Sequence, residues 1–323
     1  MVIGQSMKNK KVLPGQVFLI MTGFICNNDC IMCSVKPKGL HYKPRETEEI
    51  IVDMERGRKL QYERIEFTGG EPTVRVDLLA LIIKAKQLGY KEIALGTNAR
   101  TLSSLDFLKS LKKGGINRIT TTLYGYNSKT HEMVTRTSGS FQQTVQGIKN
   151  SLNLGITTTV NTVVFSLTAK NLKKTGEFLV SLGVKYWTLL DLIPDGYAFE
   201  QYDKFAVNPK QLRNTFKEIE PILNKFQVVN IFDFPFCLIS PAILSKKNCN
   251  ILAAKGRTEI INQVGYKPKR FEEKSNVYYD IHKTRLKQCR QCIFYNECGG
   301  VWIPYLDLYG ESFIKPFPKK TSK

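Results

Sequence analysis

The chain has 323 residues, of which 42% are hydrophobic and 24% are charged, a composition typical of a folded globular protein. No stretch approaches the roughly 20 apolar residues of a membrane-spanning helix, and the basic cluster near the N-terminus lacks a cleavage-site pattern after it. The chain is long enough for one large domain with an appendage. We therefore expect a cytoplasmic protein without a membrane partner.

The charge balance is strongly basic, with 48 Lys and Arg against 28 Asp and Glu and a net charge of +20. Such a charge favours acidic partners in general. The basic residues are spread along the chain, apart from a short run at Lys319, Lys320 and Lys323, so a dedicated nucleic-acid surface is disfavoured. An acidic electron donor, a carboxylate-rich peptide and a merely solvated lysine-rich surface all remain compatible with the charge.

From residue 16 to about residue 195, β-branched apolar runs alternate with helical periods, several of which are closed by glycine. The strands are expected at Gln16–Ile25, Arg64–Thr68, Glu92–Gly96, Arg118–Leu123, Thr158–Phe165 and Tyr186–Ile193. The helices are expected near Thr47–Leu60, Asp77–Leu88, Leu102–Lys113, Phe141–Leu154 and Ala169–Leu182. This order predicts an α/β fold with a parallel sheet, either open or curled into a partial barrel, whose functional residues gather at the carboxyl ends of the strands.

Three cysteines follow the first predicted strand: Cys26, Cys30 and Cys33. They cannot readily form a satisfied disulfide framework, because one thiol is left over and the loops between them are short. A shared iron-sulfur cluster with one iron left open is the favoured interpretation. Structural zinc, with His41 as the only nearby fourth ligand, and a group of reduced thiols are the alternatives.

The second predicted strand ends in Thr68-Gly69-Gly70-Glu71-Pro72. Two glycines let the backbone approach a ligand closely, and Glu71 can accept a hydrogen bond from an ammonium group. An ordinary turn is the alternative for this segment taken alone.

The cysteine spacing after one strand, together with Gly69-Gly70-Glu71-Pro72 after the next, resembles the radical S-adenosylmethionine (SAM) superfamily. The resemblance implies a partial (β/α)6 barrel over residues 16–200. It also implies that Cys26, Cys30 and Cys33 hold a [4Fe-4S] cluster, whose open iron binds the amino and carboxylate groups of SAM. Reductive cleavage of SAM then gives a 5′-deoxyadenosyl radical that abstracts hydrogen from a substrate.

The same resemblance assigns SAM-binding roles to several residues. Gly69, Gly70 and Glu71 would meet the methionine amino group, and Arg136 would hold the methionine carboxylate. Thr97 and Asn98 would approach the ribose or methionine moiety, and Asn161 and Ile193 would contact the ribose and adenine. For Arg136 a surface ion pair is the alternative, and for Asn161 a strand residue without a ligand.

His131 lies in a segment that resembles the loop after the fourth strand in the branch with peptide-modifying maturases and the molybdenum-cofactor GTP cyclase. The favoured interpretation is that His131 caps the helix before Arg136, and a catalytic role is the alternative.

The repeat stops after residue 196, and a second region, residues 201–323, begins with a linker and a helix at Pro209–Lys225. A strand-like run follows at Gln227–Phe232, then a helical stretch at Pro241–Lys255. The segment Cys289-x2-Cys292-x5-Cys298 resembles the core of the SPASM or twitch domain, which carries auxiliary iron-sulfur clusters.

Five cysteines remain in this region, enough for one four-thiolate cluster and not for two. We expect a single auxiliary [4Fe-4S] cluster on Cys289, Cys292, Cys298 and Cys237. Cys249 is the alternative fourth ligand, and a structural zinc site is the alternative to the cluster.

The leading functional hypothesis is a radical SAM enzyme that acts on a peptide or protein, reduced by an acidic ferredoxin or flavodoxin. A small-molecule enzyme of cofactor biosynthesis and a nucleic-acid-modifying enzyme are less favoured. The GTP cyclase itself is disfavoured, because its second cluster has another cysteine spacing and its diglycine C-terminus is absent. The hypothesis from another class is a non-catalytic iron-sulfur scaffold or electron carrier.

Overall fold

The structure is a computed structural model that describes residues 16–37, 45–253, 262–264, 272–274 and 282–319. Its centre is one eight-stranded sheet in the order β1 to β8, in which every neighbouring pair is parallel. The strands are β1 Val17–Met21, β2 Arg64–Thr68, β3 Glu92–Thr97, β4 Arg118–Thr122, β5 Thr157–Val164, β6 Tyr186–Asp191, β7 Val228–Phe232 and β8 Cys249–Leu252. This α/β architecture agrees with the predicted class and is consistent with a partial barrel.

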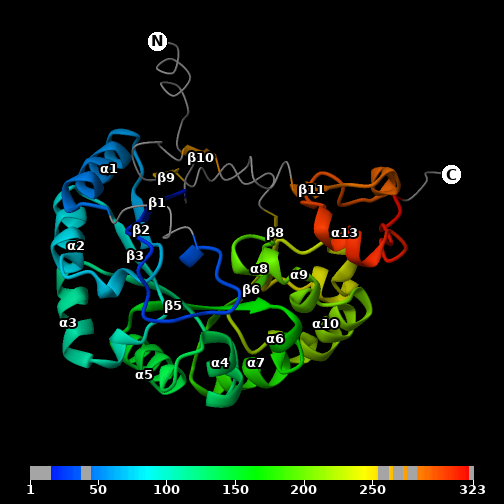
Figure 1. Ribbon diagram of the computed structural model, residues 1–323, viewed down its shortest axis with the longest axis horizontal. Helices are drawn as coiled ribbons and strands as arrows, with labels where there is room; N and C mark the ends of the chain where they lie inside the picture. The colour runs from blue at the N-terminus through cyan, green and yellow to red at the C-terminus, as the bar shows by residue number, and fades with distance from the viewer. Residues whose placement is uncertain (1–15, 38–44, 254–261, 265–271, 275–281, 320–323) are drawn as a thin grey trace, which may run out of the picture.

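The main helices are α1 Thr47–Lys59, α2 Leu78–Gln87, α3 Leu105–Gly114, α4 Ser128–Thr135, α5 Ser140–Asn153, α7 Leu172–Ser181 and α10 Pro209–Leu223. Shorter helical segments are η2 Pro72–Val74, η3 Thr101–Ser103, α6 Ser166–Ala169, α8 Tyr197–Glu200, α9 Tyr202–Phe205, η4 Phe236–Leu238 and α11 Pro241–Leu244. In Figure 1 the larger helices follow the outside of the row of strands. The parallel strands are thus joined by crossover helices, as the alternating pattern predicts.

The two faces of the sheet differ in polarity. Alternate residues of β2 and β5, such as Phe67 and Val160, are fully buried and pack in hydrophobic clusters with helix residues. The residues between them are partly exposed and largely polar, as in Thr157, Thr159 and Asn161 of β5. Because side chains alternate along a strand, one face is the core and the other is a polar inner face.

The second region does not begin where the sheet ends. β7 and β8 lie beyond residue 200 and pair in parallel with β6 and with each other. The division at residue 200 therefore stays a prediction, while the sheet itself continues to Leu252.

The predicted helix Pro241–Lys255 is wrong over its described part. Only Pro241–Leu244 is helical, and Cys249–Leu252 forms β8 on the edge of the sheet. The run Asn-Cys-Asn-Ile has little helix propensity, and pairing with β7 supplies backbone partners that outweigh it.

The C-terminal region packs beside the α8 to α10 side of the sheet (Figure 1). It contains a two-stranded pair, β11 Lys283–Thr284 with β12 Val301–Trp302, the short helix η5 Lys287–Gln291 and the helix α13 Ile303–Tyr309. A second short pair joins β9 Asn262–Val264 to β10 Glu272–Lys274.

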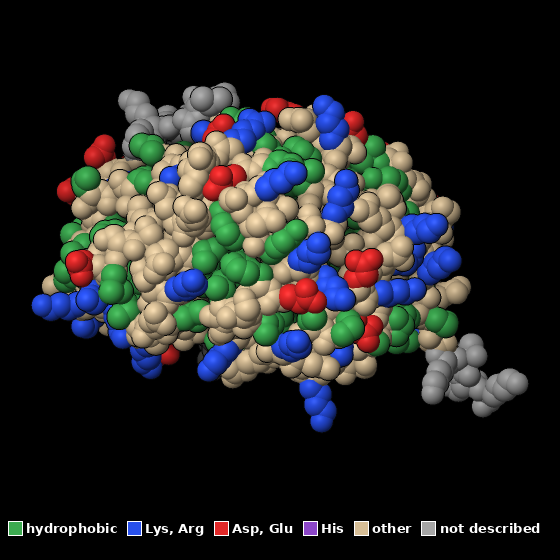
Figure 2. Space-filling view, turned by 90° about the horizontal axis from the view of Figure 1, so that it is seen from below, with side chains coloured by type: hydrophobic (Ala, Val, Ile, Leu, Met, Phe, Trp, Pro, Cys, Tyr) green, Lys and Arg blue, Asp and Glu red, His purple; other side chains and the backbone are tan. Residues whose placement is uncertain are grey.

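The described surface shows how the basic residues are distributed. On the face seen in Figure 2, Lys and Arg side chains are spread among hydrophobic and acidic ones and do not gather into one patch. No helix in the described part of the chain combines the length and the apolar character needed to cross a membrane.

Candidate functional site: two groups of cysteines

The three-cysteine loop follows β1 and lies against the turn after β2. Gly70 N donates to Gly23 O at 2.8 Å. A Cβ on Gly70 would lie 2.3 Å from Ile25 O, and one on Gly69, where φ is +132°, would lie 2.4 Å from Gly23 O. The two glycines therefore let this turn pack directly on the backbone that leads into Cys26.

Glu71 is 2% exposed, and both of its oxygens are occupied. Oε1 accepts hydrogen bonds from Thr73 N at 3.1 Å and from the hydroxyls of Thr73 and Thr97 at 2.6 Å, and Oε2 accepts from Asn98 N at 2.6 Å. Burial raises the pKa of Glu71, and these donors oppose the rise. The carboxylate thus joins the ends of β2 and β3, and its predicted contact with the methionine amino group stays a prediction.

Asn98, which follows β3, reaches the cysteine loop. Its Nδ2 donates to Asn27 Oδ1 at 2.6 Å and lies 3.9 Å from Cys26 Sγ. The backbone N–H of Asn28 lies 3.4 Å from the same sulfur. The three-cysteine loop and the end of β3, which were expected to lie at the same edge of the sheet, are therefore in contact.

Arg100 is a site residue that the sequence reasoning missed. Its Nη1 donates to Asn28 Oδ1 at 3.0 Å and to the Asn27 carbonyl, and its Nε donates to Gln143 Oε1 on α5 at 2.7 Å. One guanidinium thus joins the cysteine loop to α5. Its only signal in the sequence is its place two residues after Asn98.

Arg136 lies at the end of α4 with a left-handed backbone, φ 51°. Its Nη1 is 3.8 Å from Asp29 Oδ2, and its side chain is 55% exposed. Lys36 forms the closer ion pair with Asp29, at 2.5 Å. Arg136 therefore stands beside the cysteine loop with much of its side chain accessible, and its predicted role with the methionine carboxylate is untested.

His131 lies inside α4 and does not cap it, because the Asn127 side chain accepts from Thr130 N at the N-terminus of the helix. Its Nδ1 accepts from Tyr124 N at 3.2 Å, and its ring lies 5.9 Å from that of Phe141. Burial lowers the pKa of His131 to about 4. It is a neutral core histidine at physiological pH.

The three thiols lie close enough to affect one another. The pKa of Cys30 is raised to about 12, first by burial and then by the charges of Cys33 and Cys26, while a hydrogen bond with the Tyr124 side chain opposes the rise. His41, the fourth ligand of the zinc alternative, lies outside the described residues.

Asn161 lies on β5, partly exposed on the inner face. Ile193 follows the end of β6 and packs against the hydrophobic cluster of the α7 and α10 side. Both positions are at or near the carboxyl edge of the sheet, where they were expected.

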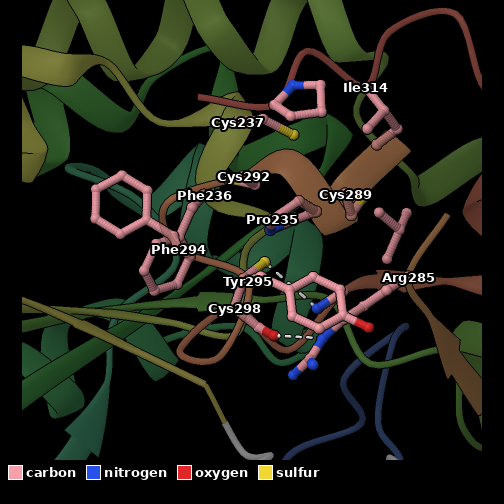
Figure 3. Close-up of a pocket in the computed structure, with 13 residues that line it drawn as sticks. Pro235, Phe236, Cys237, Arg285, Cys289, Cys292, Phe294, Tyr295, Cys298 and Ile314 are labelled. Carbon is pink, nitrogen blue, oxygen red and sulfur yellow. Dashed lines mark hydrogen bonds between the residues drawn. The ribbon is translucent and has the colours of Figure 1, made fainter. Parts of the chain in front are cut away.

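Four cysteines of the second region line one pocket: Cys237, Cys289, Cys292 and Cys298 (Figure 3). Burial raises the pKa of Cys237 to about 11, and Cys298 and Cys289 are near enough to raise it too. Gly300 N lies 3.4 Å from Cys298 Sγ. The sequence resemblance predicted this set, and the fold brings it together from segments more than 50 residues apart.

The pocket walls are mainly apolar and aromatic. Phe294 packs against Phe236 and Phe317, with ring centroids 5.4 and 5.5 Å apart. Arg285 closes one side, since its Nε donates to Cys298 O at 2.9 Å and its guanidinium lies 4.8 Å from the centre of the Tyr295 ring. This lining limits solvent access to the thiols: Cys292 is buried and the other three are partly buried.

Cys249 lies on β8, buried, and is not among the residues that line this pocket. Burial raises the pKa of Cys249 to about 11, and the nearby charge of Lys246 opposes the rise. The arrangement therefore favours Cys237 as the fourth thiol of the set.

A buried network of charged and aromatic groups joins the sheet to the C-terminal region, and the sequence reasoning missed it. Lys283 Nζ pairs with Asp233 Oδ1 at 2.8 Å and lies 4.3 Å from the centre of the Trp302 ring. Trp302 Nε1 in turn donates to Asp191 Oδ2, at the end of β6, at 3.1 Å. Burial raises the pKa of Asp191 to about 7, an effect that Lys283 opposes and Asp233 reinforces.

Comparison with known families connects this geometry to a known kind of domain. The model of the Radical SAM superfamily matches residues 20–179, which contain the three-cysteine loop and the ends of β2 to β5. Residues 20–179 therefore match a radical SAM domain.

Relatives of the radical SAM domain include proteins named probable GTP 3′,8-cyclase. Those of Saccharolobus islandicus (strain Y.N.15.51 / Yellowstone #2) and Sulfurisphaera tokodaii are 28% identical over 208 and 202 residues, which is 63% and 61% of this chain. The matched region spans only about 64% and 63% of the length of these two relatives.

Solved structures share the fold of the radical SAM domain and of the region after it. anSMEcpe with bound AdoMet and Kp18Cys peptide has a TM-score of 0.65 at 15% identity, covering 93% of this chain and 92% of that one. Streptococcus suis SuiB bound to precursor peptide SuiA has a TM-score of 0.52 at 15% identity, covering 65% and 46%. At these identities the likeness concerns the fold alone.

The residues of the radical SAM domain fit the cofactors that its family implies. Three thiols on one loop provide soft ligands for three irons of a four-iron cluster and leave the fourth iron to SAM. Among the described residues no three His, Cys, Asp or Glu side chains are arranged to hold a single metal ion.

Proposed function

We propose that the protein is a radical SAM enzyme that reductively cleaves SAM and abstracts a hydrogen atom from a peptide or protein. Cys26, Cys30 and Cys33 would hold the [4Fe-4S] cluster, which supplies the electron for the cleavage when bound. The chain's own contribution is to place the cofactor at the ends of β2 to β5, next to the polar inner face.

One observation carries this proposal: the fold gathers seven of the eight cysteines into two separate groups, a three-thiol loop and a four-thiol pocket. A four-iron cluster held by three thiols has one iron free to bind a ligand. A cluster held by four thiols has no free iron, so its role is limited to electron transfer. We infer that the second group, Cys237 with the three cysteines of residues 289–298, holds a single auxiliary [4Fe-4S] cluster in a SPASM- or twitch-like region.

A peptide substrate is supported by the four-thiol pocket and by the fold that the chain shares with anSMEcpe, which was solved with a bound peptide. The same proposal assigns Gly69, Gly70, Glu71 and Arg136 to the methionine end of SAM. It assigns Thr97 and Asn98 to the ribose or methionine moiety, and Asn161 and Ile193 to the ribose and adenine. Their positions around the three-cysteine loop and at the carboxyl edge support it.

The second candidate is a small-molecule enzyme of cofactor biosynthesis, which the 28% identity to probable GTP 3′,8-cyclases supports. The charges of the sheet weigh against a nucleoside triphosphate on the inner face. Arg64 and Arg118 both donate to Glu92, at 2.7 and 2.9 Å. Both arginines are therefore already paired with a carboxylate of the same sheet, which makes them poor partners for phosphate groups.

The experiment is anaerobic reconstitution with iron and sulfide, followed by iron analysis and an assay for 5′-deoxyadenosine with dithionite. We expect about eight irons per chain and production of 5′-deoxyadenosine from SAM. Fewer than about seven irons would contradict the two-cluster assignment. Binding of iron without specific affinity for SAM would favour the scaffold or electron carrier instead.

A further inference from the structure

Polar side chains form a continuous row across the inner face of four neighbouring strands. The row consists of Asn161 on β5, Thr188 on β6, Asn230 on β7 and Asn250 on β8. These residues are direct register partners: Asn161 pairs with Thr188, Thr188 with Asn230, and Asn230 with Asn250. Register partners in neighbouring parallel strands point to the same face, about 4.8 Å apart.

Hydrogen bonds fix the orientation of three members of this polar row. Asn250 Nδ2 donates to Asn230 Oδ1 at 3.0 Å, and Asn230 Nδ2 donates to Thr188 Oγ1 at 3.3 Å. The Thr188 hydroxyl keeps its proton to donate, and the Asn250 carbonyl oxygen keeps its lone pairs to accept. The row is therefore a preoriented set of neutral donors and acceptors.

The polar row is uncharged, and three of its four members are at least partly exposed. Asn250 is exposed, Asn161 and Asn230 are partly exposed, and Thr188 between them is buried. The buried neighbours of Asn230 on β7, Val229 and Ile231, belong to the hydrophobic core on the opposite face.

The strands around the polar row carry no excess of positive charge. Among the residues of β5 to β8 the only charged one is Asp191, which accepts a hydrogen bond from Trp302. On β1 to β4 the charged residues are two arginines and two glutamates, Arg64, Arg118, Glu66 and Glu92. In a chain with a net charge of +20, the strands of the sheet thus carry no net positive charge.

We propose that the polar row binds the main-chain amides of a neutral peptide segment. This inference rests on the proposed function and specifies its substrate class. Backbone amides offer one donor and one acceptor per residue, which match the side-chain amides and the hydroxyl of the row without requiring charge. Asn161, at the first strand of the row, would stand where cofactor and substrate meet.

The test uses isothermal titration calorimetry on the anaerobically reconstituted full chain, with acetyl-tetraalanine amide and GTP as probes. We expect the blocked peptide to bind weakly and Asn230→Leu to weaken it about fivefold to tenfold, the effect of one to two neutral hydrogen bonds. Thr157→Val is the matched control, because Thr157 lies on the same face of β5, four residues before Asn161. It should bind the peptide as the wild type does.

Three outcomes would overturn the inference. The first is that the wild type does not bind the blocked peptide, and the second is that Asn230→Leu binds this peptide as tightly as the wild type does. The third is that the wild type binds GTP and Asn230→Leu binds GTP more weakly. Circular dichroism of both variants shows whether they fold. The assay for 5′-deoxyadenosine with the wild type tests the proposed function separately, because a peptide can occupy the row whether or not SAM is cleaved.

Discussion

The two groups of cysteines are held in opposite ways. The three-cysteine loop is fixed by polar contacts from several elements: Asn98 after β3, Arg100 with α5, and the carbonyls of Thr135 and Val134 on α4, which accept from Asp29 N and Ile31 N. The four-thiol pocket is instead enclosed by aromatic and apolar side chains, among them Phe236 and Phe294.

This difference fits two chemical tasks. A loop held by hydrogen bonds at its rim can keep its position while a polar ligand such as SAM enters and leaves. An apolar enclosure limits solvent access, which tunes the potential of a cluster that only exchanges electrons. Four experiments test this difference.

The largest effect is expected from removing one thiol of each group. Cys30→Ser should abolish formation of 5′-deoxyadenosine, while Cys298→Ser should keep cleavage of SAM and lose only the auxiliary cluster. Each variant should retain roughly four irons. Iron analysis and the cleavage assay measure both quantities.

Cys249→Ser is the matched control for these variants, because Cys249 is buried but does not line the four-thiol pocket. It should keep about eight irons. Loss of roughly four irons in Cys249→Ser, with retention in Cys237→Ser, would reverse the choice of the fourth ligand.

A large effect on stability is expected from Glu71→Gln. The amide places a donor where the carboxylate now accepts four hydrogen bonds, so a buried donor meets another donor. We expect the free energy of unfolding of the apoprotein to fall by about 2 to 3 kcal/mol in urea titration. Thr73→Val removes one of the donors and should cost less, about 1 kcal/mol.

If Glu71→Gln unfolded at the same urea concentration as the wild type and only weakened SAM binding, the carboxylate would be a ligand of the cofactor. The joining of β2 to β3 through this residue would then be dispensable.

A moderate effect is expected from pH on the network that joins the four-thiol pocket to β6. The pKa of Asp191 is raised to about 7 in the fold, so the native state keeps a proton that the unfolded chain releases near pH 4. The stability contributed by this group is therefore present below about pH 4 and is lost as pH rises towards 7. Asp191→Asn should remove that dependence.

Scanning calorimetry of both proteins at pH 5 and pH 8 measures this effect. We expect the unfolding temperature of Asp191→Asn, relative to that of the wild type, to be higher at pH 8 than at pH 5. Parallel changes in the two proteins between these pH values would show that Asp191 titrates normally.

The smallest effect concerns the reductant. A chain with net charge +20 should accept electrons from an acidic ferredoxin or flavodoxin at a rate that falls several-fold between low salt and about 0.5 M salt. Stopped-flow reduction at several ionic strengths measures it. A rate that does not change with salt would contradict an acidic partner.

Local sequence signals predicted seven of the eight strands of the sheet and the first group of cysteines. Strands such as Arg64–Thr68 were predicted with their observed bounds, because apolar alternation and terminal glycines are local signals. The three thiols lie within eight residues, so their proximity needs no tertiary information.

The tertiary structure was needed to separate the two candidates for the fourth thiol and to reveal other contacts between distant groups. Cys237, the expected fourth thiol, lines the pocket with Cys298 and Cys249 does not, a difference that local spacing does not encode. The network of Asp191, Trp302 and Lys283 was missed for the same reason. Cys249 was predicted in a helix but lies in strand β8, because pairing with β7 outweighs the weak helix propensity of the neighbouring residues.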